Sequence, residues 1–201
     1  MEKTQIRQLM RERRNNISNQ EYLHAAKNCA EIIITNKLLD NCQKIALYLS
    51  QDNELDLYLL LEHCLKLKKE CYLPVLNNNK LDFAIYNHSS TLQTNRYNIP
   101  EPVMDNKHSS KISAKELDLV FLPLVAFTKT GQRLGMGGGY YDQTFAFLAN
   151  SSNNDNNSNN NILKPKLIGV AYDLQCMDQL PADSWDINLN GIITESAYIK
   201  I

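Results

Sequence analysis

The 201-residue chain is long enough to bury one sizeable hydrophobic core, and 43% of its residues are hydrophobic, as in globular proteins. Its formal net charge of -1 argues against a nucleic-acid-binding protein, which usually carries a basic excess, and no apolar run is long enough to span a bilayer. The charged N-terminus lacks the apolar segment of a secretory signal, and the five cysteines are scattered without a CxxC pair, so we expect a cytoplasmic protein with reduced thiols.

The first predicted element is a helix from about Glu2 to Asn15, in which apolar residues recur at helical spacing. Its basic residues share one stripe, because positions i, i+4, i+8 and i+11 fall on one side of a helix: Lys3, Arg7, Arg11 and Arg14. On spacing alone, this stripe is either a solvated basic face or an anion-binding surface. A second helix is predicted to start at a capping box formed by Ser18 and Glu21.

The pattern of residues 44–86 is strand, helix, strand, strand. Residues 44–50 are almost continuously apolar, as expected of a strand covered on both sides, and apolar residues from Leu57 to Leu65 predict a helix. Residues 71–76 predict a second strand, and Pro74 indicates that it ends early or that the missing donor does no harm there. Residues 80–86 alternate as a half-buried strand does.

The second half of the chain holds the strongest strand signal, residues 117–127, followed directly by a glycine cluster. Before it, residues 89–110 are polar and irregular, and two prolines fix an extended segment. After the cluster we predict a helix from about Tyr140 through Leu148, a buried strand at residues 167–172 and a short last strand at residues 191–195. Asparagine makes up eight of the twelve residues 150–161, so we expect a disordered surface insertion there.

This order of elements predicts an α/β fold: an open, mainly parallel sheet covered by helices on both faces, in a single domain over residues 1–201. In such sheets, ligands bind outside the carboxyl ends of the strands. The glycine cluster follows Phe127 and is therefore expected at this edge.

Five of the seven glycines lie within residues 131–139, which indicates that the backbone there must approach something closely. Consecutive N–H groups in such a loop form a concavity for anions, and the N-terminus of the next helix adds partial positive charge. The generic nucleotide motifs GxxxxGK[ST] and GxGxxG are absent. Arg133 could bind phosphate, Asp142 could hold a divalent cation, and the two tyrosines between them could stack on a ring. The alternative is a tight turn between strand and helix.

Two further acidic residues are candidates for the same site. Asp186 could share Mg²⁺ with Asp142, because Mg²⁺ usually takes one or two carboxylates together with phosphates and waters. Taken alone, Asp186 is a capping or turn residue. Glu54 follows the first predicted strand at its carboxyl end, and the alternative for it is the start of a helix, where acidic side chains are favoured.

These segments together resemble the 5-formyltetrahydrofolate cyclo-ligase, or methenyltetrahydrofolate synthetase, family over nearly the whole chain. The matching pieces are Lys3-x-x-x-Arg7, YLSQDNELD at 48–56, NIPEP at 98–102, DLVFLPLVAFTKTGQRLGMGGGYYD at 118–142, GVAYDLQ at 169–175 and LPADSWDINLNGIITE at 180–195. The string GxRLGxGxGYYD is highly specific to that family. Met136 stands where relatives often have Tyr or Arg, and Trp185 where many have His, but neither departure removes a charge that the mechanism needs.

The resemblance implies an enzyme that uses ATP and Mg²⁺ to convert 5-formyltetrahydrofolate to 5,10-methenyltetrahydrofolate, with ADP and phosphate as the other products. It implies that the formyl oxygen attacks the γ-phosphate, that N10 then attacks the activated carbon, and that phosphate leaves. Phosphorylation turns a poor leaving group into a good one, while positioning and charge neutralisation assist a poor nucleophile.

The resemblance also implies roles for individual residues. The expected ATP-binding residues are Lys3, Arg7, Arg133, Leu134, Gly135, Met136, Gly137, Gly138, Gly139, Tyr140 and Tyr141. The expected folate-binding residues are Leu49, Glu54 and Tyr140, the metal ligands are Asp142 and Asp186, and the catalytic residues are Arg133 and Asp142. We expect a monomer that binds this small-molecule substrate and neither nucleic acid nor membrane.

Two other functions fit parts of the sequence. One is a non-catalytic folate- or nucleotide-binding relative. It is disfavoured because all five charged residues of the expected phosphate and metal sites are present: Lys3, Arg7, Arg133, Asp142 and Asp186. The other is a different enzyme on a similar sheet, such as a sugar-phosphate isomerase, which would need neither a paired metal site nor an ATP loop.

Overall fold

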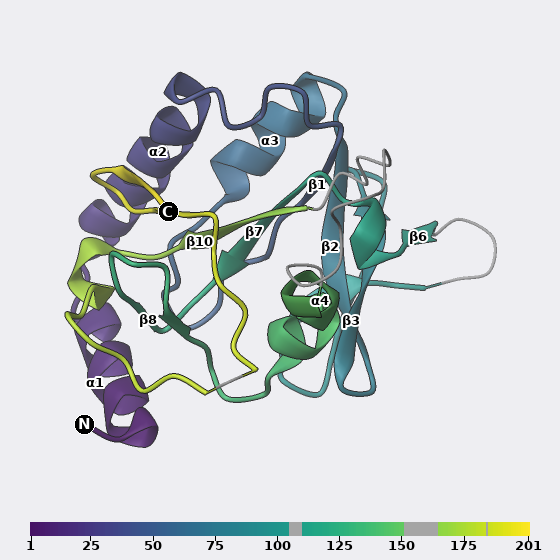
Figure 1. Cartoon of the computed structure of the whole chain (residues 1–201). Helices are drawn as coiled ribbons and strands as arrows, with labels where there is room; N and C mark the ends of the chain where they lie inside the picture. Colours follow the sequence, from purple (N-terminus) through teal and green to yellow (C-terminus); the bar gives the residue numbers. More distant parts are fainter. Residues whose placement is uncertain (105–109, 151–164, 184) are drawn as a thin grey trace, which may run out of the picture.

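The computed structural model describes residues 1–104, 110–150, 165–183 and 185–201, and its centre is a mixed sheet of eight strands (Figure 1). In spatial order the strands are β12 (Tyr198–Lys200), β11 (Gly191–Ile193), β10 (Lys166–Val170), β7 (Leu119–Pro123), β1 (Lys44–Ala46), β2 (Glu70–Asn77), β3 (Lys80–Tyr86) and β6 (Lys111–Ile112). The five strands from β11 to β2 are parallel, whereas β12 at one side and β3 and β6 at the other pair antiparallel. The predicted α/β fold with a mainly parallel sheet is confirmed.

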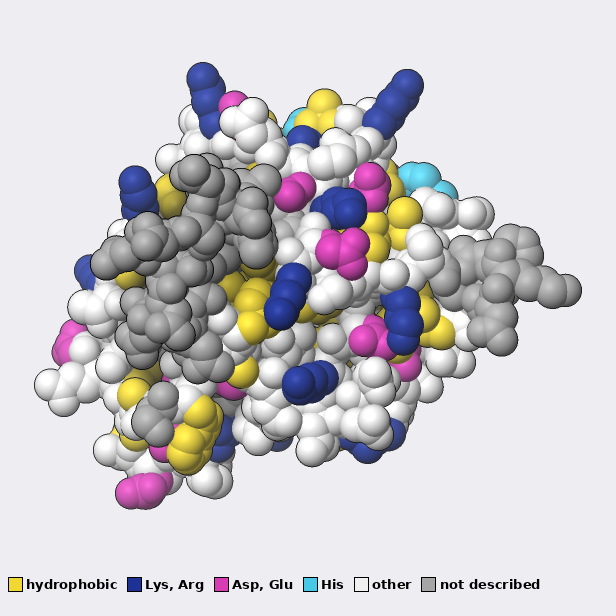
Figure 2. All heavy atoms as spheres, turned by 45° about the vertical axis from the view of Figure 1, so that its right-hand side comes forward, with side chains coloured by type: hydrophobic (Ala, Val, Ile, Leu, Met, Phe, Trp, Pro, Cys, Tyr) yellow, Lys and Arg dark blue, Asp and Glu magenta, His cyan; other side chains and the backbone are white. Residues whose placement is uncertain are grey.

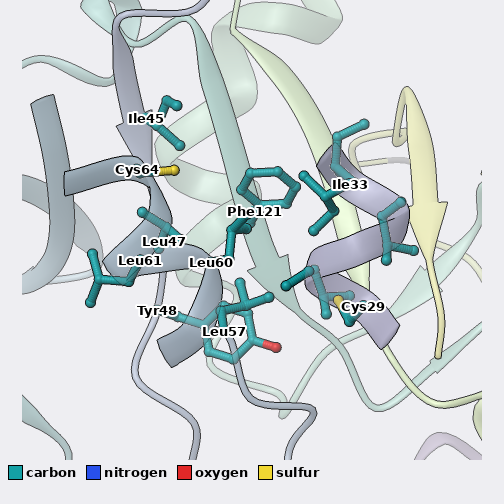
Figure 3. Packing of buried hydrophobic residues seen from close by; sticks show 14 of the residues in the cluster. Cys29, Ile33, Ile45, Leu47, Tyr48, Leu57, Leu60, Leu61, Cys64 and Phe121 are labelled. Carbon is teal, nitrogen blue, oxygen red and sulfur yellow. The ribbon is translucent and has the colours of Figure 1, made fainter. Parts of the chain in front are cut away.

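Helices cover both faces of this sheet, as predicted. On one face α2 (Asn19–Thr35) and α3 (Tyr58–Lys66) pack against the strands, and on the other α4 (Tyr140–Asn150) does. Figure 3 shows the cluster of buried residues on the first of these faces. Side chains of α2 and α3 meet those of the strands there: Cys29, Ile33, Leu60, Ile45 and Phe121. Each fully buried Leu, Ile or Phe side chain contributes about 1.5–3 kcal/mol, so the two apolar faces of the sheet hold the helices in place.

The start of α2 follows directly from the local sequence. The Ser18 hydroxyl accepts a hydrogen bond from the Glu21 backbone, and the Glu21 carboxylate accepts one from the Ser18 N–H at 2.8 Å. This reciprocal capping box satisfies N–H groups that have no partner within the helix. The predicted start of the second helix is confirmed.

Helix α1 (Lys3–Asn15) lies away from the two covering layers, beside the segment that follows β7 (Figure 1). Its apolar face, with Ile6 and Met10, packs against Val125, Ala126 and Leu134 in a third cluster of buried residues. This packing turns the basic residues at the start of the helix toward the glycine-rich loop.

The segment predicted as one strand at residues 117–127 is two strands, which corrects the prediction. β7 ends at Pro123, which has no N–H to continue the ladder. The chain then enters β8 (Ala126–Phe127), which forms an antiparallel hairpin with β9 (Arg133–Leu134). A hairpin therefore separates the central strand from the glycine loop, which the sequence analysis had placed directly after Phe127.

Of the two alternatives for Pro74, the second holds: β2 runs through the proline, whose missing donor does no harm because pairing with β1 ends at Tyr72 and β3 is the paired neighbour there. Two other predictions on strands need correction. The segment expected to be irregular contains the strand pair β4 (Leu92–Thr94) and β5 (Pro100–Pro102). The strand at residues 191–193 is not the last, because β12 follows it.

The remaining described elements are the short 3₁₀ helices Ala114–Glu116 and Asp173–Gln175. On the face shown in Figure 2, Lys and Arg side chains are scattered among acidic and uncharged ones. None of the helices in the described ranges combines the length and apolar character that crossing a membrane requires. The Asn-rich stretch predicted to be an insertion lies almost entirely in residues 151–164, outside the described part of the chain.

Candidate functional site

A cavity of about 740 Å³ opens beyond the carboxyl ends of β1 and β7, where the α/β topology predicts a ligand. Its walls come from the start of α1, the loop after β1, the loop between β4 and β5, the glycine loop with the start of α4, and Asp183, Trp185 and Asp186. Every site residue expected from the sequence lines it: Lys3, Arg7, Leu49, Glu54, Arg133, Leu134, Gly135, Met136, Gly137, Gly138, Gly139, Tyr140, Tyr141, Asp142 and Asp186. Segments that are far apart in the sequence thus meet at one site.

The glycine cluster divides into two parts with different structural tasks. Gly131, with φ of 91°, forms the turn of the β8–β9 hairpin, where its N–H donates to the Thr128 carbonyl at 3.0 Å. Residues 135–139 form the cavity wall. In that loop Gly137 and Gly139 have φ of 107° and 64°, and a Cβ atom on Gly138 would lie 2.6 Å from the Tyr140 ring. A side chain at these positions would strain the backbone or displace the tyrosine.

Two basic residues of α1 reach this wall. The Arg7 Nε donates to the Gly135 carbonyl at 2.9 Å, and the guanidinium lies against Gly137. The Lys3 ammonium lies 2.6 Å from an Asp183 carboxylate oxygen and 3.9 Å from one of Asp186. The N-terminal helix therefore places positive charge beside the backbone of the glycine loop.

Arg133 is engaged by the protein itself. Its side chain is only 5% exposed, one guanidinium nitrogen donates to an Asp142 carboxylate oxygen at 2.6 Å, and another donates to the Ile187 carbonyl. The same Asp142 oxygen accepts the Ile187 N–H at 3.2 Å. This network ties the start of α4 to the segment that carries Asp186, and it fixes the orientation of the Asp142 carboxylate.

The two predicted metal ligands lie on the same wall, and each keeps acceptor capacity. Asp186 accepts the Asp183 N–H through Oδ2 at 2.8 Å. Among the described residues, no hydrogen bond or ion pair uses Oδ2 of Asp142 or Oδ1 of Asp186. The described residues contain no cluster of three or more His, Cys, Asp or Glu that would enclose a metal. A pair of carboxylates with free oxygens beside an anion-binding loop suits Mg²⁺ that receives its other ligands from phosphate and water.

Glu54 projects into the cavity from a strained turn after β1. Asp52 and Asn53 have φ of 48° and 55°, a left-handed conformation that Asp and Asn tolerate better than most residues. The Glu54 N–H donates to the Gln51 carbonyl, and the Gln51 N–H donates to the Glu54 carboxylate at 3.1 Å. Burial raises the pKa of Glu54 to about 7, while the Gln51 N–H and then Arg14 act in the opposite direction. Its charge therefore changes near neutral pH.

The loop between β4 and β5 forms a wall that the sequence analysis did not assign to the site. Tyr97, Asn98 and Ile99 line the cavity there. The Tyr140 hydroxyl accepts a hydrogen bond from Arg96 at 2.6 Å and lies 2.8 Å from the Tyr97 hydroxyl. These hydrogen bonds, from Tyr97 first and then Arg96, lower the pKa of Tyr140. In the sequence, the one feature that pointed to this loop was that Tyr97 directly precedes the NIPEP segment. That position does not predict a contact between Tyr97 and Tyr140, which lies more than 40 residues later.

Trp185 is a second residue whose position the sequence analysis missed. It lines the cavity next to Asp186, and 67% of its surface is exposed. In the sequence it stood out only as a departure from a family pattern. By contrast, Tyr141 also lines the cavity but is held from behind, since its ring stacks on Phe145 with a centroid distance of 6.4 Å.

Comparison with known sequences gives a consistent family. The model of the 5-formyltetrahydrofolate cyclo-ligase family matches residues 1–195. The chain is 35% identical to the 5-formyltetrahydrofolate cyclo-ligase of Escherichia coli (strain K12) over 191 residues, covering 94% of this chain and 97% of that one. It is 32% identical to the enzyme of the same name from Haemophilus influenzae, covering 94% and 95% of the two chains.

A solved structure agrees with these sequence matches. The 5,10-methenyltetrahydrofolate synthetase of Aquifex aeolicus superposes with a TM-score of 0.80 at 28% identity, covering all of this chain (100%) and 93% of that one. The similarity therefore extends over the whole fold, including the elements that form the cavity.

Proposed function

The chain belongs to the 5-formyltetrahydrofolate cyclo-ligase family, and from this premise we propose that its cavity converts 5-formyltetrahydrofolate to 5,10-methenyltetrahydrofolate with ATP and Mg²⁺. The observation that carries the proposal is that every residue matched to a role in that reaction lines one cavity at the carboxyl ends of the strands. A volume of about 740 Å³ lies within the range of small-molecule sites.

The glycine-loop wall is the proposed site of ATP. Backbone N–H groups of residues 135–139 and the N-terminus of α4 supply donors and partial positive charge for phosphates. Lys3 and Arg7 approach this loop from α1 and add two formal charges. Lys3 would exchange its contact with Asp183 for a phosphate oxygen, because an ammonium group rotates freely among acceptors.

Asp142 and Asp186 would hold Mg²⁺ through the carboxylate oxygens that the protein leaves free. Held there, Mg²⁺ would supply positive charge that offsets the charge of the phosphates. Arg133 holds Asp142 in its ion pair and adds positive charge beside the phosphates. We propose that its contribution to catalysis comes from this position on the cavity wall.

The opposite wall is the proposed site of the folate. The Glu54 carboxylate would accept hydrogen bonds from N–H groups of the pterin ring, and Leu49 would contact the flat face of that ring. Tyr140 stands between the two walls, with its hydroxyl held by Arg96 and Tyr97. In this arrangement the formyl group would face the phosphates.

The reaction balances without a general base at its first step. The formyl oxygen, which carries no proton, forms a bond to the γ-phosphorus as the bond to ADP breaks. N10 then attacks the formyl carbon and loses its proton, and phosphate leaves with the former formyl oxygen. The protein's task is to position the groups and to offset negative charge, and the cavity provides residues for both.

The test is to follow the absorbance of the methenyl product with purified protein, 5-formyltetrahydrofolate and Mg²⁺, with and without ATP. We expect product only when ATP is present. An absence of ATP-dependent product would contradict the proposal, and turnover of a sugar phosphate without ATP would favour the isomerase alternative. We further propose that the enzyme works as a monomer, because one chain supplies a candidate residue for every proposed role, and that it works in the cytoplasm, where its free cysteines would stay reduced.

A further inference from the structure

Arg14 is a buried arginine that has no role in the proposed mechanism. It lies in the last turn of α1, is 1% exposed and does not line the cavity. Its Nε and Nη1 atoms have no hydrogen-bond partner among the described residues. A guanidinium stays charged in proteins, so a buried one with free donors requires a nearby anion to remain stable.

The carboxylate of Glu54 is that anion. Its Oε1 lies 3.9 Å from Nη1 of Arg14, and this is the ion pair of Arg14 in the described part of the chain. Glu54 is itself only 8% exposed, and unlike Arg14 it lines the cavity. The two charges therefore face each other through the cavity wall, with the arginine behind it and the carboxylate at its surface.

The other groups around Glu54 do not supply positive charge. The titratable neighbours that act on it or respond to it are Asp52, Tyr22, Tyr48 and Tyr141. Asp52 opposes the negative charge on Glu54, and it is paired at 3.8 Å with the exposed Arg11. The Gln51 N–H gives a hydrogen bond but no net charge. Among the described residues, Arg14 is thus the cation that stabilises an ionised Glu54.

We propose that Arg14 is a positioning residue for folate recognition, which holds the Glu54 carboxylate charged and oriented toward the cavity from behind its wall. The inference rests on the proposed folate contact of Glu54. An ionised carboxylate has about four lone-pair sites, so Gln51 and Arg14 leave acceptor capacity for a ligand. A neutral Glu54 would turn one of its oxygens into a donor and would accept hydrogen bonds from N–H groups of the ring more weakly.

The basic stripe of α1 therefore has more than one task. Arg7 faces the glycine loop and Lys3 faces Asp183 and Asp186, whereas Arg14 lies two helical turns beyond Arg7 and faces Glu54. One helix contributes positive charge to both halves of the cavity.

The Arg14–Glu54 ion pair determines how the loss of Arg14 should change the pH dependence of folate use. Without Arg14 the pKa of Glu54 rises above its value of about 7, so the charged form appears only at higher pH. Loss of Arg14 should then weaken folate use most at neutral and acidic pH and least in alkali. A general packing defect would lower activity without moving the pH at which it is gained.

The experiment compares Arg14→Met, Arg14→Lys and Arg13→Met with the unchanged enzyme, measuring kcat/KM for 5-formyltetrahydrofolate and for ATP from pH 6 to 9.5. For Arg14→Met we expect the acid limb of the folate profile to move up by about one pH unit, with a loss of about fivefold at pH 7 that approaches tenfold at pH 6 and an unchanged KM for ATP. Arg14→Lys should restore most of the profile. Arg13 is exposed and bonds the Leu174 carbonyl, so its replacement should leave the profile in place.

A ¹³C NMR titration of the Glu54 carboxyl in the Arg14→Met and Arg14→Lys proteins separates this inference from the proposed function. A titration midpoint that moves up in Arg14→Met and returns in Arg14→Lys supports the coupling. If Glu54→Gln leaves folate kinetics unchanged, the folate contact fails even where the coupling holds. An unchanged midpoint and an unchanged acid limb in Arg14→Met would overturn the inference. If Arg14→Met does not fold, Arg14→Lys and Arg14→Gln give the same comparison.

Discussion

The two walls of the cavity are built differently. The glycine-loop wall comes largely from one segment, residues 133–142, and offers backbone donors with buried or half-buried charges beside them. The Glu54 wall combines the loop after β1, the β4–β5 loop and, behind it, the end of α1, and it depends on a buried carboxylate. In the proposed function, the first wall would recognise charge through groups that are always available, whereas the second would recognise its ligand through a side chain whose charge depends on its surroundings.

This difference predicts different sensitivities. Removing a charge at the glycine-loop wall should lower turnover at every pH, because phosphates are bound there at every pH. Changes at the Glu54 wall should act on one substrate and should depend on pH.

Asp142→Asn should have the largest effect. It keeps the size of the side chain but removes the charge that pairs with Arg133 and that would bind Mg²⁺. We expect kcat to fall on the order of 100-fold or more, as when one electrostatic contact to a transition state is removed, and the Mg²⁺ concentration for half-maximal rate to rise. Kinetics measured over a range of Mg²⁺ would check this, and unchanged values would refute the metal role.

A matched control for that change exists outside the cavity. Asp118 also accepts two hydrogen bonds, from the N–H groups of Gln43 and Lys44. Asp118→Asn should lower the melting temperature without changing the Mg²⁺ requirement. If both variants changed the Mg²⁺ requirement alike, the effect of Asp142→Asn would reflect folding instead of metal binding.

Two glycine substitutions should separate folding from nucleotide binding. Gly138→Ala would place a Cβ atom 2.6 Å from the Tyr140 ring, so we expect the KM for ATP to rise about tenfold or more with a small change in stability. Gly131→Ala would force alanine into φ of 91° in the hairpin turn. Its cost is about 1–2 kcal/mol of stability, with the KM for ATP retained. Thermal denaturation and ATP kinetics on both proteins check this, and the opposite assignment would show that the glycine cluster acts as one unit.

Glu54→Gln should act mainly on the folate. Hydrogen bonds to charged groups contribute about 1.5–3 kcal/mol, so we expect a roughly tenfold or larger rise in the KM for 5-formyltetrahydrofolate and a smaller change for ATP. In the unchanged enzyme, kcat/KM for the folate should fall as the pH drops through about 7, because Glu54 takes up a proton there. The variant should lose this dependence. Equal effects on both substrates would count against a pterin contact.

How much of the fold and of the site can be predicted from the sequence depends on how far apart the interacting residues lie along the chain. The capping box of Ser18 and Glu21 and the backbone of the glycine loop are local, so the sequence predicts them directly. The break at Pro123 was hidden because residues on both sides of it are apolar and buried. A strand as short as β12 gives too few residues for a period to be recognised.

Contacts between distant segments were the least predictable. Tyr97 and Tyr140 meet only because the β4–β5 loop folds over the start of α4. Arg14 and Glu54 are 40 positions apart, and the stripe on α1 gave no reason to treat Arg14 differently from Arg7. Family resemblance named the ligand-facing residues, but the buried charge behind one of them emerges only from the packed structure.

Deleting residues 151–160 should have the smallest effect. Asparagine and serine make up most of this stretch, and such side chains cannot form a packed core. If the two walls are complete without it, the deletion should leave both KM values and kcat within about twofold, since long surface insertions change loop-closure entropy only slightly. Steady-state kinetics and thermal denaturation would check this, with a Gly/Ser replacement of the same length as the control. Loss of folding in the deletion alone would show that the spacing is needed, whereas loss in both would show that the asparagines themselves belong to the structure.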